Sequence, residues 1–444
     1  MLKSLGIMLI SSVQVFLTVT ALQAQTRSQP ETIFSNVRIF DGTKLTSPMN
    51  VLVTGNQIAK ISADPIVADN AAIQIAGEGR TLMPGLIDAH WHTFMVAPSM
   101  AVATTAPINF VTLLAGAEAE ATLMRGFTSV RDLGGPSFGL KMAIDRGVIP
   151  GPRIWPSGAM ISQTGGHGDF RMLSEIPSPS GALSYAERVG MSAIVDSPDE
   201  VRKRTREQLL QGASQIKVVS GGGVSSPYGP LDTVQLSVKE IRAAVEAAAN
   251  WGTYVTVHAY TPEPIRNAIE AGVKVIDHGQ LADEETVKLM AEKGIWWSLQ
   301  PFLDDENANQ HAHGDGQASS AAVRAGTDNA YKLAKKHGVK VAFGTDILFD
   351  AARAAQQGSQ LATMTRWYTP AEVLKMATAD NAELLALSDR RNPYPGKLGV
   401  VEEGALADLL LVDGDPIADI ELLADPSNKL LVIMKDGQIF KNQL

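Results

Sequence analysis

The chain has 444 residues, of which 45% are hydrophobic and 19% are charged. This composition is typical of a globular protein with a large core and excludes an intrinsically disordered chain. The formal net charge of −9 argues against nucleic acid or an anionic membrane surface as a partner. Because the chain has no cysteine, disulfides and thiolate metal sites are excluded.

Residues 1–24 have the pattern of a secretory signal peptide. Lys3 precedes an apolar run over residues 5–22, and small residues follow, with Ala24 as the last residue before a cleavage site. An uncleaved membrane anchor is the alternative. We therefore predict an exported protein, periplasmic or secreted, with no membrane contact after the signal is removed.

Both ends of the remaining chain are rich in predicted strands and poor in predicted helices. Residues 31–42 and 49–63 precede the central part, and residues 407–415 and 429–442 follow it. The Asp436-Gly437 pair is a hairpin signal. Neither end has enough strands for a core of its own. We therefore predict one composite β-sandwich built from residues 25–83 and 397–444.

Between these ends, a helical stretch, a glycine and a short β-branched strand recur. The glycines stand where a helix end requires a left-handed residue. Eight such strands alternate with helices, and no G-x-G-x-x-G motif follows the first one. The pattern predicts an α/β protein whose residues 84–396 form a (β/α)8 TIM barrel. The eight strand segments are residues 85–93, 125–132, 152–161, 211–222, 251–260, 271–279, 293–301 and 337–346.

Polar side chains occur at the C-terminal ends of several of these strands, which is where barrel enzymes place their chemistry. His90 and His92 share one face of the first strand because side chains alternate with period two. A lone strand-end histidine is more often structural than a ligand, but several histidines and one aspartate at the same rim favour a metal site. The predicted ligands are His90, His92, Lys217, His258, His278 and Asp346.

Lys217 stands among Ile216, Val218 and Val219, so its amine is expected to be buried with a lowered pKa. Two interpretations remain open at this point. The lysine forms a buried ion pair, for instance with Asp346, or its neutral amine captures carbon dioxide as a carbamate that bridges two cations.

The motif "PGLIDAHWH" at residues 84–92, the strand-four Lys217, His258, His278 and the "FGTD" that ends in Asp346 together resemble the amidohydrolase superfamily in its binuclear form. Within it, "TSVRDLGG", "GGHGD", "IKVVSGGGVSSP" and "IDHG" resemble the imidazolonepropionase-like branch. That branch contains prolidase-like and Xaa-Arg/Lys dipeptidases, metallocarboxypeptidases and ochratoxinase-like amidases. Its members are often homo-oligomers.

The resemblance implies a specific set of metal ligands. His90, His92 and Asp346 would hold one divalent cation, His258 and His278 would hold a second, and carboxylated Lys217 would bridge them. A donor set of nitrogen and oxygen atoms suits Zn²⁺, although cobalt, manganese and iron remain open. A pair of cations lowers the pKa of a shared water and yields a hydroxide nucleophile near neutral pH, with Asp346 placed to move its proton.

The expected reaction is hydrolysis of the amide bond of a dipeptide or N-acyl amino acid, a small-molecule substrate. A lactonase, a cyclic amidase or a phosphotriesterase with the same site is the enzymatic alternative. A barrel that has lost catalysis, or a mononuclear deaminase-like site, remains open as well.

Further residues are candidates for contact with the substrate. His167 and Tyr228 are candidates for stabilising an oxyanion, with a plain loop histidine and a packing tyrosine as the alternatives. The glycine-rich segment of Ser220, Gly221 and Gly222 offers backbone N–H groups for a substrate carboxylate. Tyr260 follows His258 by two residues and is expected to face the pocket.

The remaining candidates have simpler interpretations. His311 and His313 lie in a polar loop and are expected to be solvated. His337 precedes a glycine at a helix end, where an imidazolium complements the helix dipole. Asp132 is expected to be a structural hydrogen-bond acceptor.

Overall fold

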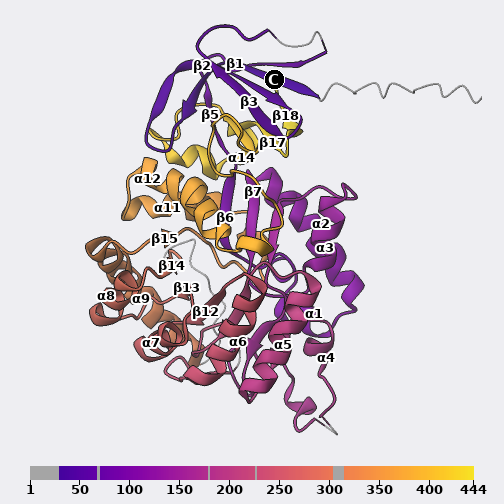
Figure 1. The fold of residues 1–444 in the computed structure, drawn as a ribbon, viewed down its shortest axis with the longest axis vertical. Coiled ribbons are helices and arrows are strands. Elements are labelled where there is room, and N and C mark those ends of the chain that lie inside the picture. Colours follow the sequence, from indigo (N-terminus) through magenta and orange to yellow (C-terminus); the bar gives the residue numbers. More distant parts are fainter. Residues whose placement is uncertain (1–29, 68–70, 179–180, 226–227, 304–314) are drawn as a thin grey trace, which may run out of the picture.

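The computed structural model describes residues 30–67, 71–178, 181–225, 228–303 and 315–444. The predicted signal peptide, residues 1–24, lies outside these ranges and stays a prediction. Within them, no helix is both long and apolar enough to cross a membrane. A β-rich part lies at one end of the molecule, and a larger part built of strands and helices lies below it in the view of Figure 1.

Strands from both ends of the chain share one eight-stranded sheet, with the order β18-β17-β16-β5-β1-β2-β3 and β4 beside β1. Strand β16 pairs antiparallel with β5 and so joins the two ends. The sheet curls back on itself, because Ile58 exchanges backbone hydrogen bonds with Gly404 and Ala405. The strands are β1 (Glu31–Phe40), β2 (Leu45–Thr54), β3 (Gln57–Ser62), β4 (Ile73–Ala76), β5 (Thr81–Pro84), β16 (Leu409–Val412), β17 (Leu430–Lys435) and β18 (Gln438–Asn442).

This sheet encloses an apolar cluster of its own, which includes Phe34, Val37, Ile58, Leu409 and Val432. Since β1 and β16 both contribute to the cluster, neither end of the chain could bury its apolar side chains alone. The exact limits of the composite domain, residues 25–83 and 397–444, stay predictions.

The larger part contains parallel strands in two hydrogen-bonded sheets. One has three strands, in the order β6-β7-β8, and the other has seven, in the order β10-β9-β11-β12-β13-β14-β15. The strands are β6 (Leu86–Trp91), β7 (Phe127–Asp132), β8 (Arg153–Pro156), β9 (Met160–Ser162), β10 (Ser192–Ile194), β11 (Ile216–Val219), β12 (Val255–Ala259), β13 (Val275–His278), β14 (Trp296–Ser298) and β15 (Val341–Ala342).

The third predicted strand is divided between the two sheets. Residues 152–161 were expected to form one strand, but β8 ends at Pro156 and β9 begins at Met160. Between them, Gly158 has a φ of 73°, a left-handed conformation that interrupts an extended strand. An added Cβ at Gly158 would lie 2.4 Å from Oε1 of Gln208, so the close packing also requires glycine there.

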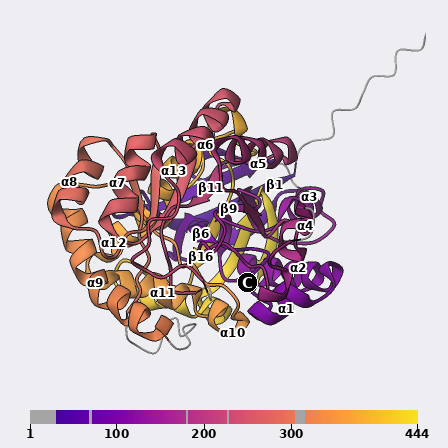
Figure 2. The same cartoon turned by 90° about the horizontal axis from the view of Figure 1, so that it is seen from below.

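The first and last parallel strands are also connected. Ala89 donates a backbone hydrogen bond to Phe343, and Asp346 donates one to His90. Figure 2 shows helices surrounding the strands on several sides. The parallel α/β architecture is thus confirmed, whereas a closed barrel with one continuous ladder of hydrogen bonds stays a prediction because the ladder is interrupted between β8 and β9.

Several helices end in the glycines that the sequence predicts. Gly212, Gly252 and Gly272 follow α5, α6 and α7 with φ values of 102°, 74° and 102°. The helices are α1 (Met100–Thr105), α2 (Ile108–Met124), α3 (Phe138–Asp145), α4 (Tyr185–Arg188), α5 (Pro198–Gln211), α6 (Val238–Trp251), α7 (Pro262–Ala271), α8 (Glu284–Glu292), α9 (Asp315–His337), α10 (Ala351–Ala354), α11 (Gln357–Thr363), α12 (Pro370–Lys375), α13 (Asn381–Ala386) and α14 (Pro426–Lys429).

Candidate active site

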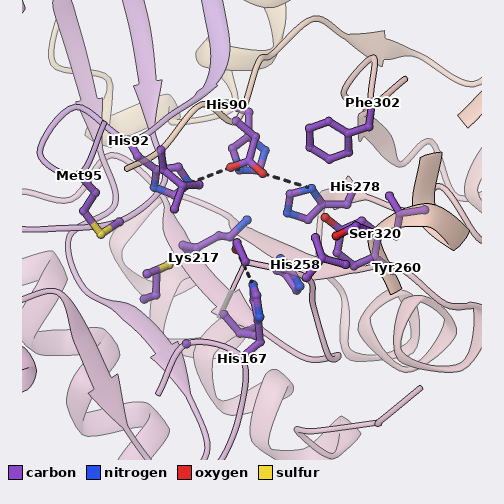
Figure 3. Close-up of a pocket in the computed structure, with 18 of the residues that line it drawn as sticks. His90, His92, Met95, His167, Lys217, His258, Tyr260, His278, Phe302 and Ser320 are labelled. Atoms are coloured by element: carbon purple, nitrogen blue, oxygen red, sulfur yellow. Dashed lines mark hydrogen bonds and ion pairs between the residues drawn. The ribbon is translucent and has the colours of Figure 1, made fainter. Parts of the chain in front are cut away.

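The predicted metal ligands converge on one cavity, with about 840 Å³ of free space that is partly open to solvent. Figure 3 shows His92 and Met95 on one side of this space, His278, Phe302 and Ser320 on the other, and Lys217 between them. The predicted ligands that line it are His90, His92, Lys217, His258, His278 and Asp346.

His90, His92 and Asp346 form a compact group at the junction of the first and last parallel strands. Oδ1 of Asp346 lies 3.2 Å from Nε2 of His90 and 3.1 Å from Nε2 of His92. Each residue offers one ligand atom within 4.8 Å of the other two. All three side chains are buried, so these atoms face one another with little competing water.

A second buried carboxylate holds this group in place. Asp88 accepts hydrogen bonds from the backbone N–H of His90 and from the hydroxyl and the backbone N–H of Thr345. These hydrogen bonds connect Thr345, the residue before Asp346, to the strand that carries His90. Asp346 itself has a left-handed backbone, with a φ of 53°, which costs energy in a residue that has a Cβ. The strained conformation is typical of a functional site.

His258 and His278 approach each other on neighbouring strands, with ring centroids 4.4 Å apart. Burial holds the pKa of both imidazoles well below the usual value, and it lowers the pKa of His90 to about 4. These histidines are therefore neutral near pH 7, and a neutral imidazole is the form that ligates a metal.

Lys217 is buried, with 2% of its surface exposed, and its Nζ lies 2.6 Å from Oδ2 of Asp277. Asp277 also accepts a hydrogen bond from Arg131 at 2.7 Å. Burial lowers the pKa of Lys217, while the charge of Asp277 opposes that effect. The ion pair that the sequence left open therefore exists, but its partner is Asp277 instead of Asp346.

Sequence reasoning missed Asp277 because it precedes His278, and neighbouring strand residues normally point to opposite sides. His278 has a φ of 74°, which breaks the strand geometry at that residue. As a result, Asp277 reaches Lys217 and His278 still lines the cavity.

His167 and Tyr260 both line the cavity, as the sequence suggested. The ring of His167 stacks on His258 with centroids 4.4 Å apart, and its Nε2 lies 3.4 Å from the hydroxyl of Ser225. Burial lowers the pKa of His167 to about 4, so the ring is neutral. Tyr260 stacks on His278, and burial raises the pKa of its phenol well above 10.

The backbone of the glycine-rich segment forms hydrogen bonds within the chain. The backbone N–H groups of Ser220, Gly222 and Gly223 donate to His258, Thr233 and Gly229, respectively. The carbonyl of Gly222 lies 3.1 Å from Nε2 of His258. The described residues that line the cavity do not include Ser220, Gly221, Gly222 or Tyr228, which is half-buried. Their contact with a substrate stays a prediction, and these hydrogen bonds do not support it.

The structure also tests the interpretations of Asp132 and His337. Asp132 accepts hydrogen bonds from the backbone N–H of Thr93 and the hydroxyl of Ser137, as a structural acceptor would. His337 ends α9, where its Nε2 lies 3.0 Å from Oε1 of Glu284. His311 and His313 lie outside the described residues.

The donor set fits divalent cations. Its members are imidazoles and one carboxylate, and His92 has a buried Nδ1 without a hydrogen-bond partner in the described part of the chain. Nitrogen and oxygen donors in this arrangement suit zinc and related transition metals.

The model of the "Amidohydrolase family" matches residues 81–440. The chain belongs to the amidohydrolase family. The matched segment begins in β5 and ends in β18, so it covers the metal-ligand candidates but not strands β1 to β4 of the composite sheet. The resemblance read from the sequence is therefore confirmed, and the chain is a member of a family of hydrolases.

Three similar proteins illustrate the relationship. Ochratoxinase from Aspergillus niger is 34% identical over 373 residues, which are 81% of this chain and 75% of that protein. A prolidase crystallised with N-methylphosphonate-L-proline has a TM-score of 0.85 and 34% identity, over 93% of this chain and all of the other. A Xaa-Pro dipeptidase with bound methionine has a TM-score of 0.78 and 30% identity, with the same coverage.

Proposed function

We propose that this amidohydrolase cleaves the amide bond of dipeptides or N-acyl amino acids at a centre of two divalent cations. The observation that carries the proposal is the convergence of four imidazoles, a lysine and an aspartate on one cavity. The imidazoles of His90, His92, His258 and His278 would hold the cations with Asp346 and carboxylated Lys217. When bound, the cations, Zn²⁺ by preference, polarise a carbonyl and acidify water.

Asp346 is the group that moves the proton in this proposal. The neighbouring imidazoles outweigh the effect of burial, so the pKa of Asp346 is held well below its usual value and it is a carboxylate at neutral pH. A carboxylate at this position accepts a proton from the attacking water and delivers it to the departing amine. The amine leaves as the C-terminal amino acid.

His167 is the first candidate for stabilising the oxyanion of the tetrahedral intermediate. It is neutral, so one ring nitrogen carries a hydrogen that can be donated. Its stacking on His258 holds the ring beside the proposed second metal site. Its Nε2 lies 3.4 Å from the hydroxyl of Ser225, and its buried Nδ1 has no hydrogen-bond partner among the described residues.

The walls of the cavity fit an apolar side chain and a carboxylate. Met95, Met160, Phe170 and Phe302 line it, and Arg324 from α9 is the one guanidinium among its described lining residues. A guanidinium matches the planar carboxylate of an amino acid. The names of ochratoxinase and the Xaa-Pro dipeptidase, both similar to this chain, point to amide substrates as well.

The test is a hydrolysis screen on protein reconstituted with a divalent metal and bicarbonate. We expect two metal ions per chain by elemental analysis and release of free amino acid from N-acyl amino acids or dipeptides. Lactones and organophosphate triesters serve as contrasts. Protein that retains no divalent ion, or that cleaves only the contrast substrates, would overturn the proposal.

The predicted signal peptide and the frequent assembly of similar proteins lead to two further proposals. We propose that the chain is exported and that it forms a homo-oligomer. Cell fractionation with N-terminal sequencing tests the first, and light scattering of the mature protein tests the second.

A further inference from the structure

Gln300 is a fully buried polar residue that the proposed chemistry does not use. It stands two residues after β14 and has none of its surface exposed. Its side-chain amide lies between His90 and His278, which belong to the two different halves of the proposed metal centre. Oε1 is 2.8 Å from Nδ1 of His278, and Nε2 is 3.1 Å from Nδ1 of His90.

The orientation of this amide is fixed by a third contact. Nε2 of Gln300 donates to the backbone carbonyl of Ser298 at 2.9 Å, and a carbonyl accepts hydrogen bonds only. The amide nitrogen must therefore face Ser298, and Oε1 must face His278. Because an amide oxygen accepts only, Nδ1 of His278 is the ring nitrogen that carries the hydrogen.

The position of this hydrogen determines which ring nitrogen of His278 can bind a cation. With hydrogen on Nδ1, the lone pair of His278 is on Nε2, the other ring nitrogen, which is then available to a cation. The backbone of His278 is left-handed, so the strand does not hold the ring in a standard position. The hydrogen bond to Gln300 supplies the orientation that the strand geometry does not.

We propose that Gln300 is a positioning residue that selects the metal-binding tautomer of His278. The ring centroids of His278 and His90 are 4.8 Å apart, and the amide oxygen of Gln300, which faces His278, is the atom that carries this role. This inference rests on the proposed function, since it assigns Gln300 a role toward the metals. It differs from a packing role because it depends on the direction of one hydrogen bond.

The test compares two substitutions at Gln300 with a matched control. Gln300→Met keeps the length of the side chain and removes the hydrogen bonds, whereas Gln300→Glu keeps an acceptor for His278. Loss of such a partner typically weakens metal binding about 10- to 100-fold. We expect this loss in Gln300→Met, measured by competition with a chelator, and substantial recovery in Gln300→Glu.

Gln280 provides the control. It is a buried glutamine in the same region, but its Nε2 donates to the backbone carbonyl of Gln300 at 3.2 Å, and its amide has no hydrogen bond to an imidazole of the described residues. We expect Gln280→Met to bind metal as the wild type does. Equal losses in Gln280→Met and Gln300→Met would show a general packing effect and overturn the inference.

A second measurement needs no variant. Nitrogen-15 NMR of histidine-labelled, metal-free protein distinguishes the two tautomers, and we expect hydrogen on Nδ1 of His278. Hydrogen on Nε2 would overturn the inference even if Gln300→Met failed to fold. A wild type that binds no metal would instead overturn the proposed function. A wild type with two metals and a Gln300→Met variant with unchanged affinity would overturn the role of Gln300 alone.

Discussion

Nζ of Lys217 lies 2.6 Å from Oδ2 of Asp277, and both side chains are buried. A buried charge that loses its partner is costly. Asp277 has a second cationic partner, Arg131, at 2.7 Å. Carboxylation of Lys217 would remove one cationic partner of Asp277 and leave the other, Arg131, in place.

Lys217→Met is expected to abolish the bridge between the cations. Methionine occupies a similar volume but cannot react with carbon dioxide, so we expect at most one metal ion per chain and turnover at least about 10²-fold lower, as for other losses of a metal contact. Elemental analysis and hydrolysis assays check this. In the wild type, activity after metal reconstitution should rise with added bicarbonate. Two tightly bound ions in Lys217→Met would contradict the bridging role.

Asp346→Asn separates metal binding from proton transfer. The amide oxygen of asparagine can still ligate, but the side chain no longer accepts a proton. We expect metal content close to that of the wild type and kcat about 10²- to 10⁴-fold lower, the range for loss of a general acid–base group. Asp350→Asn is the control, because Asp350 caps α10 and pairs with Arg353 at 3.7 Å, and asparagine caps helices well. Unchanged hydrolysis in Asp346→Asn would eliminate the proposed proton shuttle.

Arg324→Met should change substrate preference more than catalysis. A hydrogen bond to a charged group contributes roughly 1.5–3 kcal/mol, so KM for an N-acyl amino acid should rise about 10- to 100-fold. The carboxamide of the same compound lacks the charge and should be hydrolysed by the variant and the wild type alike. Lys332→Met, exposed on the same helix, is the control. A similar loss for both compounds would argue against a carboxylate contact.

Asp132→Asn tests the structural role of the Asp132 carboxylate through the pH dependence of stability. Burial raises the pKa of Asp132 from 3.8 to about 6. The folded protein therefore favours the protonated form, and this contribution to stability is present below pH 3.8 and lost as the pH rises through 6. At about 1.4 kcal/mol per pKa unit, the loss is on the order of 3 kcal/mol. Asparagine does not titrate, so Asp132→Asn should remove this pH-dependent contribution to stability.

The measurement is the free energy of unfolding in urea for metal-free protein at several pH values. Relative to wild type, Asp132→Asn should gain stability between pH 4 and pH 7. Asp64→Asn, at an exposed position, should show no such change. Turnover of the reconstituted Asp132→Asn variant should stay near that of the wild type. A large loss of kcat would instead assign Asp132 a direct part in the chemistry.

Gly223→Ala should displace His167 and replaces none of the proposed metal ligands. An added Cβ at Gly223 would lie 2.2 Å from Cε1 and 2.3 Å from Nδ1 of His167, so the ring must move. Loss of one oxyanion donor typically lowers kcat about 10²- to 10³-fold, and we expect a loss approaching this with metal content unchanged. Gly139→Ala is the matched control, since nothing lies within 4 Å of its added Cβ. Full activity in Gly223→Ala would leave His167 without a role.

The sequence alone determined the parts that follow from period and spacing. Strand-end residues such as His90, His258 and Asp346 were found because alternation places them on one face and parallel strands end at one rim. The glycine caps after α5, α6 and α7 were found because a helix end needs a left-handed residue. These rules act within a few residues of the chain, so they can be read without a structure.

Only the tertiary structure decided which distant groups meet. Gln300 and Arg324 carry no local signal. Asp277 was missed because the sequence placed His278 on the inner side of the strand, whereas Asp277 is the residue in register with the inward His258. In the structure, the third predicted strand is interrupted at Gly158. The backbone N–H groups of Ser220 and Gly222 form hydrogen bonds to other residues of the chain. Hydrogen-bond partners of buried polar groups are set by packing between elements far apart in sequence, and no local pattern encodes that packing.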